Sequence, residues 1–296
     1  MVKIENEKLT VLINKFGAEL KSVINKESGI EYIWPGTEGS FKKSAPNLFP
    51  FIGNILNGEI DYPLGKSERV TLPMTKHGFA RDLEFETLEV TNTIARFQLK
   101  PNSYTKERYP YNFSLIVEYI LVEDTLHHNY IVKNNDVVEM FYHIGGHTAF
   151  YCNYNNDKTF ENYYLELKEE EECNLYKIDE RNNSFLFDVP EKITVCKKFN
   201  LSKDKFAKDA LVFEGMENKE IDIKHLNSSH GIEFKFENLP ILTLWTSTDS
   251  SEFICLEPWA GITDFTNGSN KVEGKREIQR LNSNEQKKYS QIIRFY

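Results

Sequence analysis

The sequence predicts an all-β fold, a large antiparallel β-sandwich that spans residues 1–296 as a single domain. More than a dozen short segments at near-regular spacing alternate in polarity or are continuously apolar, as strands do. Phenylalanine and tyrosine, which favour sheets over helices, are abundant, with 21 and 15 copies. The chain contains no sequence repeat and no low-complexity linker, so one large core is expected.

Strand signals dominate the first third of the chain. Residues 9–14 alternate in polarity and predict a strand, and a second apolar stretch covers residues 16–20. The segment 25–29, Asn-Lys-Glu-Ser-Gly, is a turn signal. Another strand is expected at Glu31–Trp34, and a hairpin over residues 60–74.

The segment from Ser44 to Asn54 differs in composition from its neighbours. It places Pro46, Pro50 and Gly53 among apolar residues, which excludes a regular helix. An apolar loop of this kind either packs beneath a sheet or lines a pocket. The residues alone favour neither interpretation.

The middle of the chain predicts a long meander of strands. Residues 93–99, 113–119 and 126–132 alternate in polarity or are continuously apolar. His127 and His128 are adjacent in the last of these segments, so their side chains face opposite sides of the sheet. They therefore cannot form one site together.

The last third also predicts strands. Residues 230–236 alternate in polarity, whereas residues 241–245 and 253–256 are almost entirely apolar and are expected to be central strands. The final residues, 290–296, predict a closing strand. Between these regions and the meander, residues 201–209 predict one or two helical turns.

Charge and cysteine content restrict the functional classes. The formal net charge of −9 disfavours nucleic-acid binding, because no basic stripe is present to replace phosphate counterions. The four cysteines form no C-x-x-C pair and no zinc-ligand spacing, which indicates reduced thiols in a cytoplasmic protein. No apolar run approaches the roughly 20 residues of a membrane span. We therefore expect no membrane or nucleic-acid partner.

Two histidine-containing segments carry candidate functional groups. His143 and His147 are four residues apart, but the aromatic residues and glycine pair around them argue against a helix. In an extended chain they would lie about 13 Å apart, so no shared metal is expected. His147, just past the glycine pair, is the better placed of the two for a pocket. His77 lies in a glycine-containing segment with Arg81, where a solvated turn is the alternative interpretation.

Glu257 ends an apolar segment, Ile254–Leu256, and is followed by Pro258, Trp259 and Gly261. Proline removes a backbone donor, so the strand is expected to end there. A buried carboxylate costs free energy unless it is hydrogen-bonded. The residues leave two interpretations open: a strand end whose glutamate points to water, or a carboxylate held beside an aromatic surface on which a sugar ring could stack.

Several motifs together resemble the aldose 1-epimerase (galactose mutarotase-like) family, and within it the LacX-like subgroup. Each motif is weak alone, but they occur in the family's order and cover nearly the whole chain. They are Pro46–Asn54, His77–Asp82, Gly145–Phe150, Asp209–Phe213 and Leu256–Gly261. The resemblance implies a galactose mutarotase-like supersandwich with a cleft on one sheet face.

The resemblance also implies a reaction, the interconversion of the α and β anomers of an aldose without a cofactor. Glu257 would be the general base that takes the proton of the anomeric hydroxyl. His147 would be the general acid that protonates the ring oxygen, and His77 would hydrogen-bond near that oxygen. Asp209 and Arg81 would bind sugar hydroxyls. Histidine and glutamate suit this chemistry because they exchange protons near neutral pH.

The chain departs from the family pattern at Asn54, where a basic residue is common, and at Thr148, where proline is common in the subgroup. Asn54 can hydrogen-bond a hydroxyl but offers no charged fork. The resemblance implies a hexose substrate, free or phosphorylated, bound by a monomer or a homodimer. A phosphate preference would require further cations beside Arg81.

Two other functions are compatible with the same residues. One is a non-catalytic carbohydrate-binding protein on the same fold, with Trp259 and Trp34 as stacking surfaces. The other is a glycosidase that pairs Glu257 with Asp264, whose carboxyl groups would need to lie about 5–5.5 Å apart in a retaining enzyme. The presence of both Glu257 and His147 favours the epimerase, because binding alone needs no acid and base.

Overall fold

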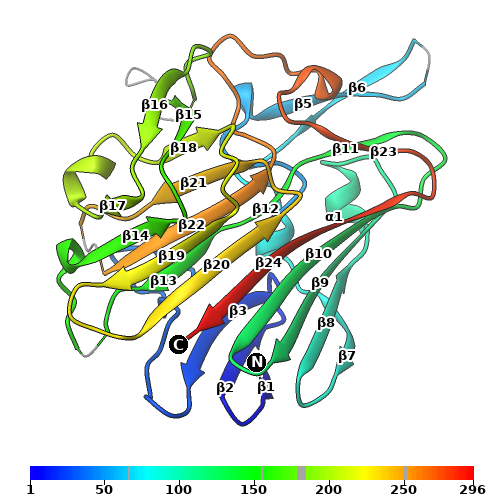
Figure 1. Cartoon of the computed structure of the whole chain (residues 1–296). Helices are drawn as coiled ribbons and strands as arrows, with labels where there is room; N and C mark the ends of the chain where they lie inside the picture. The colour runs from blue at the N-terminus through cyan, green and yellow to red at the C-terminus, as the bar shows by residue number, and fades with distance from the viewer. Residues whose placement is uncertain (66, 155, 179–184, 250–251) are drawn as a thin grey trace.

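The computed structural model describes residues 1–65, 67–154, 156–178, 185–249 and 252–296. All pairings between its named strands are antiparallel, which confirms the predicted all-β sandwich (Figure 1). The described helices are short, and none is long and apolar enough to cross a membrane. They are α1 (Ser103–Lys106) and the 3-10 turns η1 (Leu56–Gly58), η2 (Ala80–Asp82), η3 (Phe160–Asn162), η4 (Lys203–Phe206) and η5 (Val272–Gly274).

The larger of the two main sheets has nine strands. Figure 1 shows it running from β14 at the left to β7 at the right. In spatial order the strands are β17 (Lys198–Asn200), β14 (Tyr163–Leu167), β19 (Glu220–His225), β20 (Gly231–Glu237), β24 (Gln286–Phe295), β10 (Thr125–Asn134), β9 (Phe113–Val122), β8 (Ile94–Leu99) and β7 (Glu86–Val90).

The second main sheet has eight strands. Its spatial order is β16 (Glu191–Val195), β15 (Glu171–Tyr176), β18 (Leu211–Glu214), β21 (Ile241–Trp245), β22 (Phe253–Ala260), β12 (Ile144–Gly146) and β4 (Asn47–Leu48), with β13 (Thr148–Tyr151) also pairing β22. All eight residues of β22 are buried, so it is a central strand as predicted.

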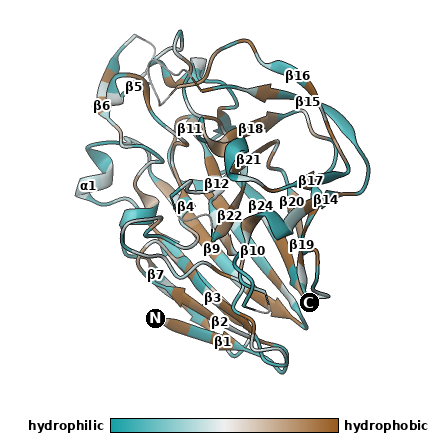
Figure 2. Cartoon of the chain, turned by 90° about the vertical axis from the view of Figure 1, so that its left-hand side faces the viewer, coloured by the Kyte–Doolittle hydropathy of each residue, from teal (hydrophilic) through white to brown (hydrophobic). Residues whose placement is uncertain are grey.

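Three smaller sheets complete the fold. The N-terminal sheet joins β1 (Val2–Glu5), β2 (Leu9–Asn14) and β3 (Glu19–Asn25). The predicted hairpin is β5 (Glu59–Pro63) with β6 (Arg69–Pro73), and a last pair is β11 (Met140–Tyr142) with β23 (Gln279–Leu281). Hydrophobic and hydrophilic residues alternate along many of these strands (Figure 2).

The core lies between the two main sheets. Phe150 on β13 contacts Phe234 on β20, with ring centroids 5.6 Å apart. Tyr130 on β10 donates a hydrogen bond to the Asn47 side chain on β4. The same core includes apolar residues of the N-terminal sheet, such as Val11. The interpretation of residues 1–296 as a single domain remains a prediction, which one cooperative unfolding transition would support.

Most predicted strands are confirmed, but two local predictions are wrong. Glu31–Trp34 forms only isolated bridges, because it changes partner along its length: Glu31 bridges to Ile24 on β3, and Ile33 bridges to Phe150 on β13. The strand that contains Glu257 does not stop at Pro258 but continues to Ala260. The proline is tolerated because the neighbouring ladder is interrupted at this point, between the end of β12 and the start of β13.

The segment 44–54 fulfils both interpretations that the sequence left open. Phe49 and Phe51 are fully buried in the main core, beneath the sheet. Gly53 and Asn54, at its end, line a cavity on the outer face of the eight-stranded sheet. The helical region predicted at 201–209 is the single turn η4.

Candidate active site

A cavity of about 290 Å³ lies on the outer face of the eight-stranded sheet, the face turned away from the main core. Seven of the residues singled out in the sequence line it: Asn54, His77, Arg81, His147, Asp209, Glu257 and Trp259. They come from segments far apart in the chain, and the fold brings their side chains together around one cavity. Further lining residues include Phe41, Lys76, Thr243 and Trp245.

Glu257 sits on the cavity side of β22 and is only 2% exposed. The even-numbered neighbours Ile254 and Leu256 point into the main core instead. Along its own face Glu257 lies between two apolar clusters, one containing Cys255 and the other Trp259. This burial, reinforced by the negative charge of Asp209, raises the pKa of Glu257 well above its usual value.

His147 is the cross-strand neighbour of Glu257. Gly145 pairs with Trp259 and Thr148 pairs with Leu256, so the unbroken register places residue 147 opposite residue 257. The distance from His147 Nε2 to Glu257 Oε2 is 3.4 Å. Burial lowers the pKa of His147 to about 3, which favours the neutral imidazole. Burial therefore favours the neutral forms of both residues, in which the one exchangeable proton of the pair is on Glu257.

The His77 ring is fixed by an unusual backbone turn. His77 and Gly78 both have positive φ, 63° and 70°, and a Cβ on Gly78 would lie only 2.2 Å from the Phe49 carbonyl oxygen. The Gly53 N–H donates a hydrogen bond of 3.1 Å to His77 Nδ1. Because Nδ1 accepts, the ring proton is assigned to Nε2. His77 can therefore act as a donor.

His77 lies close to His147. Its ring centroid is 5.8 Å from that of His147, in an edge-to-face arrangement. Burial and the positive groups nearby hold the pKa of His77 well below its usual range. The neutral form, with a hydrogen on Nε2, therefore remains the donor over a wide pH range. The alternative interpretation of this segment as a solvated turn is wrong, since His77 is buried.

Two cations and one further carboxylate line the cavity. Arg81 and Lys76 are held together by a hydrogen bond of 2.9 Å from the Arg81 guanidinium to the Lys76 carbonyl. Partial burial lowers the pKa of Arg81. Asp209 follows the η4 turn and adopts a φ of 88° directly before β18. The cavity thus combines proton carriers, hydrogen-bonding groups and positive charge.

The aromatic wall differs from the sequence expectation. Trp34 does not line the cavity; it is 3% exposed and packs against Phe253 with ring centroids 5.0 Å apart. Trp259 does line it, but its ring is mostly buried and donates a hydrogen bond to the Gly146 carbonyl. The more accessible wall is formed by Phe41 and Trp245, which the sequence analysis did not identify.

Phe41 and Trp245 enclose His147. The Phe41 ring stacks on the His147 ring at a centroid distance of 4.9 Å and an interplanar angle of 16°. The Trp245 ring lies edge-on to His147 at 5.8 Å. Trp245 could have been suspected, because it ends a strand predicted to be central. Phe41 lies in an irregular segment with no local signal.

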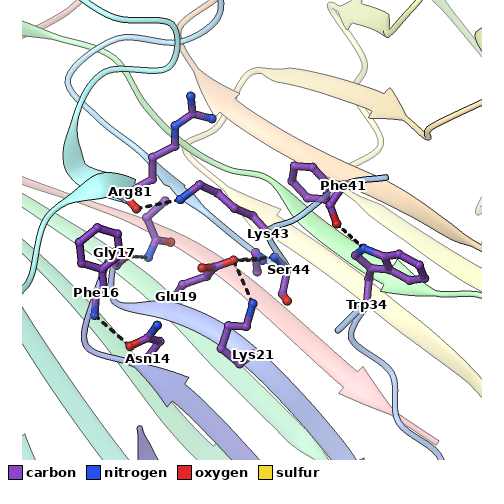
Figure 3. A network of polar contacts seen from close by, with 12 residues as sticks. Asn14, Phe16, Gly17, Glu19, Lys21, Trp34, Phe41, Lys43, Ser44 and Arg81 are labelled. Carbon is purple, nitrogen blue, oxygen red and sulfur yellow. Dashed lines mark hydrogen bonds and ion pairs between the residues drawn. The ribbon is translucent and has the colours of Figure 1, made fainter. Parts of the chain in front are cut away.

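The segment that carries Phe41 is anchored by buried polar contacts (Figure 3). Glu19 accepts a hydrogen bond of 2.5 Å from the Ser44 N–H. Lys43 donates to the Arg81 carbonyl at 3.1 Å, and Trp34 donates to the Phe41 carbonyl at 2.7 Å. These bonds tie the aromatic wall to the turn that carries the cavity's arginine.

Two other candidate residues lie outside this cavity. Asp264 is held by Lys275, with Oδ2 and Nζ 2.6 Å apart, and also accepts a hydrogen bond from the Leu56 N–H. It is therefore not placed to act with Glu257, which argues against the glycosidase. His143 points toward the Arg276 carbonyl at 3.1 Å, so it shares no site with His147, as expected.

One group among the described residues could hold a metal ion. Ligand atoms of His147, Cys255 and Glu257 all lie within 4.8 Å of one another, and all three residues are buried. The spacing of His143 and His147 in the sequence carries no signal of this group, because the three ligands come together through strand pairing and the two-residue period of β22.

Comparisons with known proteins identify the family of the chain. A family model described as aldose 1-epimerase matches residues 1–294. The plasmid-encoded protein LacX of Lactococcus lactis subsp. lactis is 30% identical over 284 residues, which cover 95% of this chain and 94% of the relative.

Two solved structures share both the fold and recognisable sequence similarity. A galactose mutarotase related enzyme from Lactobacillus acidophilus is 26% identical, with a TM-score of 0.92 and coverage of 100% of this chain and 97% of the other. A galactose mutarotase-like protein from Lactobacillus casei ATCC 334 is 27% identical, with a TM-score of 0.88 and full coverage of both chains. The fold is thus galactose mutarotase-like, and the chain belongs to the aldose 1-epimerase family.

Proposed function

We propose that this protein is an aldose 1-epimerase, or mutarotase, that interconverts the α and β anomers of a hexose. The observation that carries the proposal is the placement of Glu257 and His147 as cross-strand neighbours, 3.4 Å apart, inside a cavity. A base and an acid at this spacing can act on two oxygens attached to the same carbon. In an aldose those are the anomeric hydroxyl and the ring oxygen.

Proton transfer through the pair can open and reclose the ring. Glu257 takes the proton of the anomeric hydroxyl while His147 protonates the ring oxygen, so the C1–O bond to the ring breaks and the aldehyde forms. Rotation about the C1–C2 bond exposes the other face of the aldehyde. Reclosure with the two roles reversed returns both protons and gives the other anomer.

The number of protons carried by Glu257 and His147 suits this reaction. Burial favours one proton on the pair, with Glu257 neutral and His147 neutral. The reactive form, with Glu257 ionised and His147 protonated, contains the same number of protons. It is reached by moving one proton within the pair, and no proton has to enter from solvent. Two such groups together can supply several orders of magnitude in rate, at about 10²–10⁴-fold each.

The other lining residues are proposed to bind the sugar. The His77 Nε2 hydrogen suits the ring oxygen, whereas Asp209 and Asn54 suit hydroxyl groups. Phe41 and Trp245 offer apolar surface for the ring's C–H face. No residue in this set requires a cofactor for its proposed role.

The cations Lys76 and Arg81 support a substrate that carries a phosphoryl group. A phosphate preference requires a further cation beside Arg81, and Lys76 lines the same cavity. Both free and phosphorylated hexoses are therefore candidates, and the two cations favour the phosphorylated class. The four cysteines are free thiols, which supports residence in the cytoplasm.

Anomer-exchange NMR on glucose, galactose and their 6-phosphates tests the proposal. We expect the wild-type chain to accelerate exchange of at least one of these sugars and Glu257→Gln to lose the acceleration. Glu172→Gln, an exposed glutamate outside the cavity, is the matched control. Equal exchange rates in wild type and Glu257→Gln would contradict the assignment of the base. Saturable binding without exchange would instead support the carbohydrate-binding alternative.

A further inference from the structure

The pair of Glu257 and His147 has a third chemically reactive neighbour, Cys255. It lies two residues before Glu257 on β22, so both side chains project from the same face of the strand. The Cys255 sulfur, a carboxylate oxygen of Glu257 and a ring nitrogen of His147 are all within 4.8 Å of one another. The proposed reaction assigns no role to the cysteine.

The three ligand types fit a particular class of cation. Thiolate, imidazole and carboxylate are the ligands of Zn²⁺, whereas Mg²⁺ and Ca²⁺ prefer oxygen ligands. In a tetrahedral zinc site the ligand atoms lie about 3.3–3.8 Å apart, as follows from Zn–ligand bonds of about 2.0–2.3 Å. The three ligand atoms all lie within 4.8 Å of one another, so they would have to approach by about 1 Å at most to reach this range.

The surroundings of the three residues also suit a metal ion. Among the described residues, His147 Nδ1 is a buried atom without a hydrogen-bond partner, so the ring can rotate without breaking a hydrogen bond there. Glu257 and His147 face the cavity, which leaves room for a water as the fourth ligand. Asp209 adds a negative charge nearby, whereas Lys76 and Arg81 add positive ones, so the fit to a cation rests on the chemistry of the three ligands.

We propose that His147, Cys255 and Glu257 form a binding site for a thiophilic divalent cation such as Zn²⁺, and that its occupation blocks the cavity. Binding displaces the thiol proton of Cys255 and any proton on the other two ligands to solvent, while the water completes the coordination. The metal site rests on the three ligands alone. The inhibitory consequence rests on the proposed function, because the metal takes up the acid and the base together.

Titration of the metal-free full-length chain with Co²⁺ and Zn²⁺ tests the site without any assay of activity. We expect one Co²⁺ per chain with the absorption band of a cobalt–thiolate bond, and displacement of Co²⁺ by Zn²⁺. Cys255→Ser should lose the band and bind Zn²⁺ at least about tenfold more weakly. Cys196→Ser, which alters an exposed thiol, is the matched control and should keep both properties.

The outcomes separate this inference from the proposed function. Cys255→Ala provides a second variant if the serine is not tolerated in the buried position. A cobalt–thiolate band that survives in Cys255→Ala, or one that disappears in Cys196→Ser, would overturn the site, as would the absence of any band in wild type. Should wild type catalyse exchange, Zn²⁺ is expected to compete with the sugar and to lose its effect in Cys255→Ser. Exchange that stays insensitive to saturating Zn²⁺ would overturn the inhibitory role.

Discussion

Two of the buried carboxylates among the described residues, Asp264 and Glu257, each face a nitrogen-bearing side chain, yet their surroundings differ. Asp264 contacts Lys275 through both oxygens, at 2.8 and 2.6 Å, and also accepts a hydrogen bond from the Leu56 backbone. Glu257 faces His147 at 3.4 Å, between two apolar clusters. The carboxylate of Asp264 is thus surrounded by hydrogen-bond donors, whereas the carboxylate of Glu257 has few such partners.

This difference separates a structural pair from a reactive one. A buried charge that is saturated with hydrogen bonds is held in one ionisation state and fixes the chain around it. A buried carboxylate with few partners has a raised pKa and can exchange a proton with its neighbour. We therefore assign the Asp264 pair a structural role, since it joins Lys275 to the Leu56 backbone, and propose that the Glu257 pair provides the chemistry of the cavity. Substitutions at the Glu257 pair should therefore change catalysis, whereas substitutions at the Asp264 pair should change stability.

The largest effect is expected for His147→Gln. Loss of the proposed general acid should lower kcat/KM for anomer exchange by about 10²–10⁴-fold, measured by exchange NMR. His143→Gln is the matched control, because His143 is buried nearby in sequence but lies outside the cavity. A similar loss per folded molecule in both variants would contradict the assignment of His147.

Lys275→Met should instead affect stability. It leaves the carboxylate of Asp264 buried without its cation, and breaking such a pair costs about 3–5 kcal/mol. The free energy of unfolding from urea denaturation measures this cost. An unchanged free energy of unfolding would show that the two buried pairs do not differ in the way described here. The double variant Lys275→Met with Asp264→Leu should recover part of the loss, because no charge remains buried.

Glu257→Gln should stabilise the protein at neutral pH while removing activity. Because burial raises the folded-state pKa of Glu257, its stabilising contribution is complete below the unfolded value near 4.5 and is lost as pH rises through the folded pKa. Glutamine carries no such penalty at pH 7, so the melting temperature should rise by about 2–4 °C, which corresponds to about 1 kcal/mol. The gain should vanish below about pH 4.5. Calorimetry that finds the same difference at both pH values would contradict the raised pKa.

The smallest effect is expected for Lys76→Gln. Lys76 is exposed, so its attraction for a phosphoryl group is screened and amounts to about 0.2–1 kcal/mol. We expect KM for a hexose 6-phosphate to rise by roughly two- to fivefold, with kcat and the kinetics of the neutral hexose unchanged. Equal changes for both sugars would argue against a phosphoryl group near this lysine.

Much of the fold could be predicted from the sequence because strand alternation is local information. The strands β2, β8, β10 and β20–β22 follow directly from it. Glu31–Trp34 could not be predicted in this way, because its composition suits a strand but its partners are positioned by distant parts of the chain. The continuation of β22 past Pro258 likewise depends on the gap between β12 and β13.

The site was partly predictable for the same reason. His77 and Gly78 carry a local signal, since the turn requires a glycine, and Glu257 stands out at the end of an apolar segment. Phe41 carries no such signal, and its contact with His147 depends on anchoring by Glu19 and its neighbours. The expectation that Trp34 forms a sugar surface, part of the carbohydrate-binding alternative, is wrong because Trp34 is buried. The local sequence does not show which residues are covered by distant parts of the chain.

The central claim is that Glu257 and His147 work as one unit that shares a proton. A double-mutant cycle by anomer-exchange NMR tests it most directly, with Glu257→Gln, His147→Gln and the double variant measured on the best substrate. We predict that the double variant is no slower than the slower single variant, because either change already disables the unit. Losses that multiply in the double variant would contradict the claim, since they would mean that the two residues act independently.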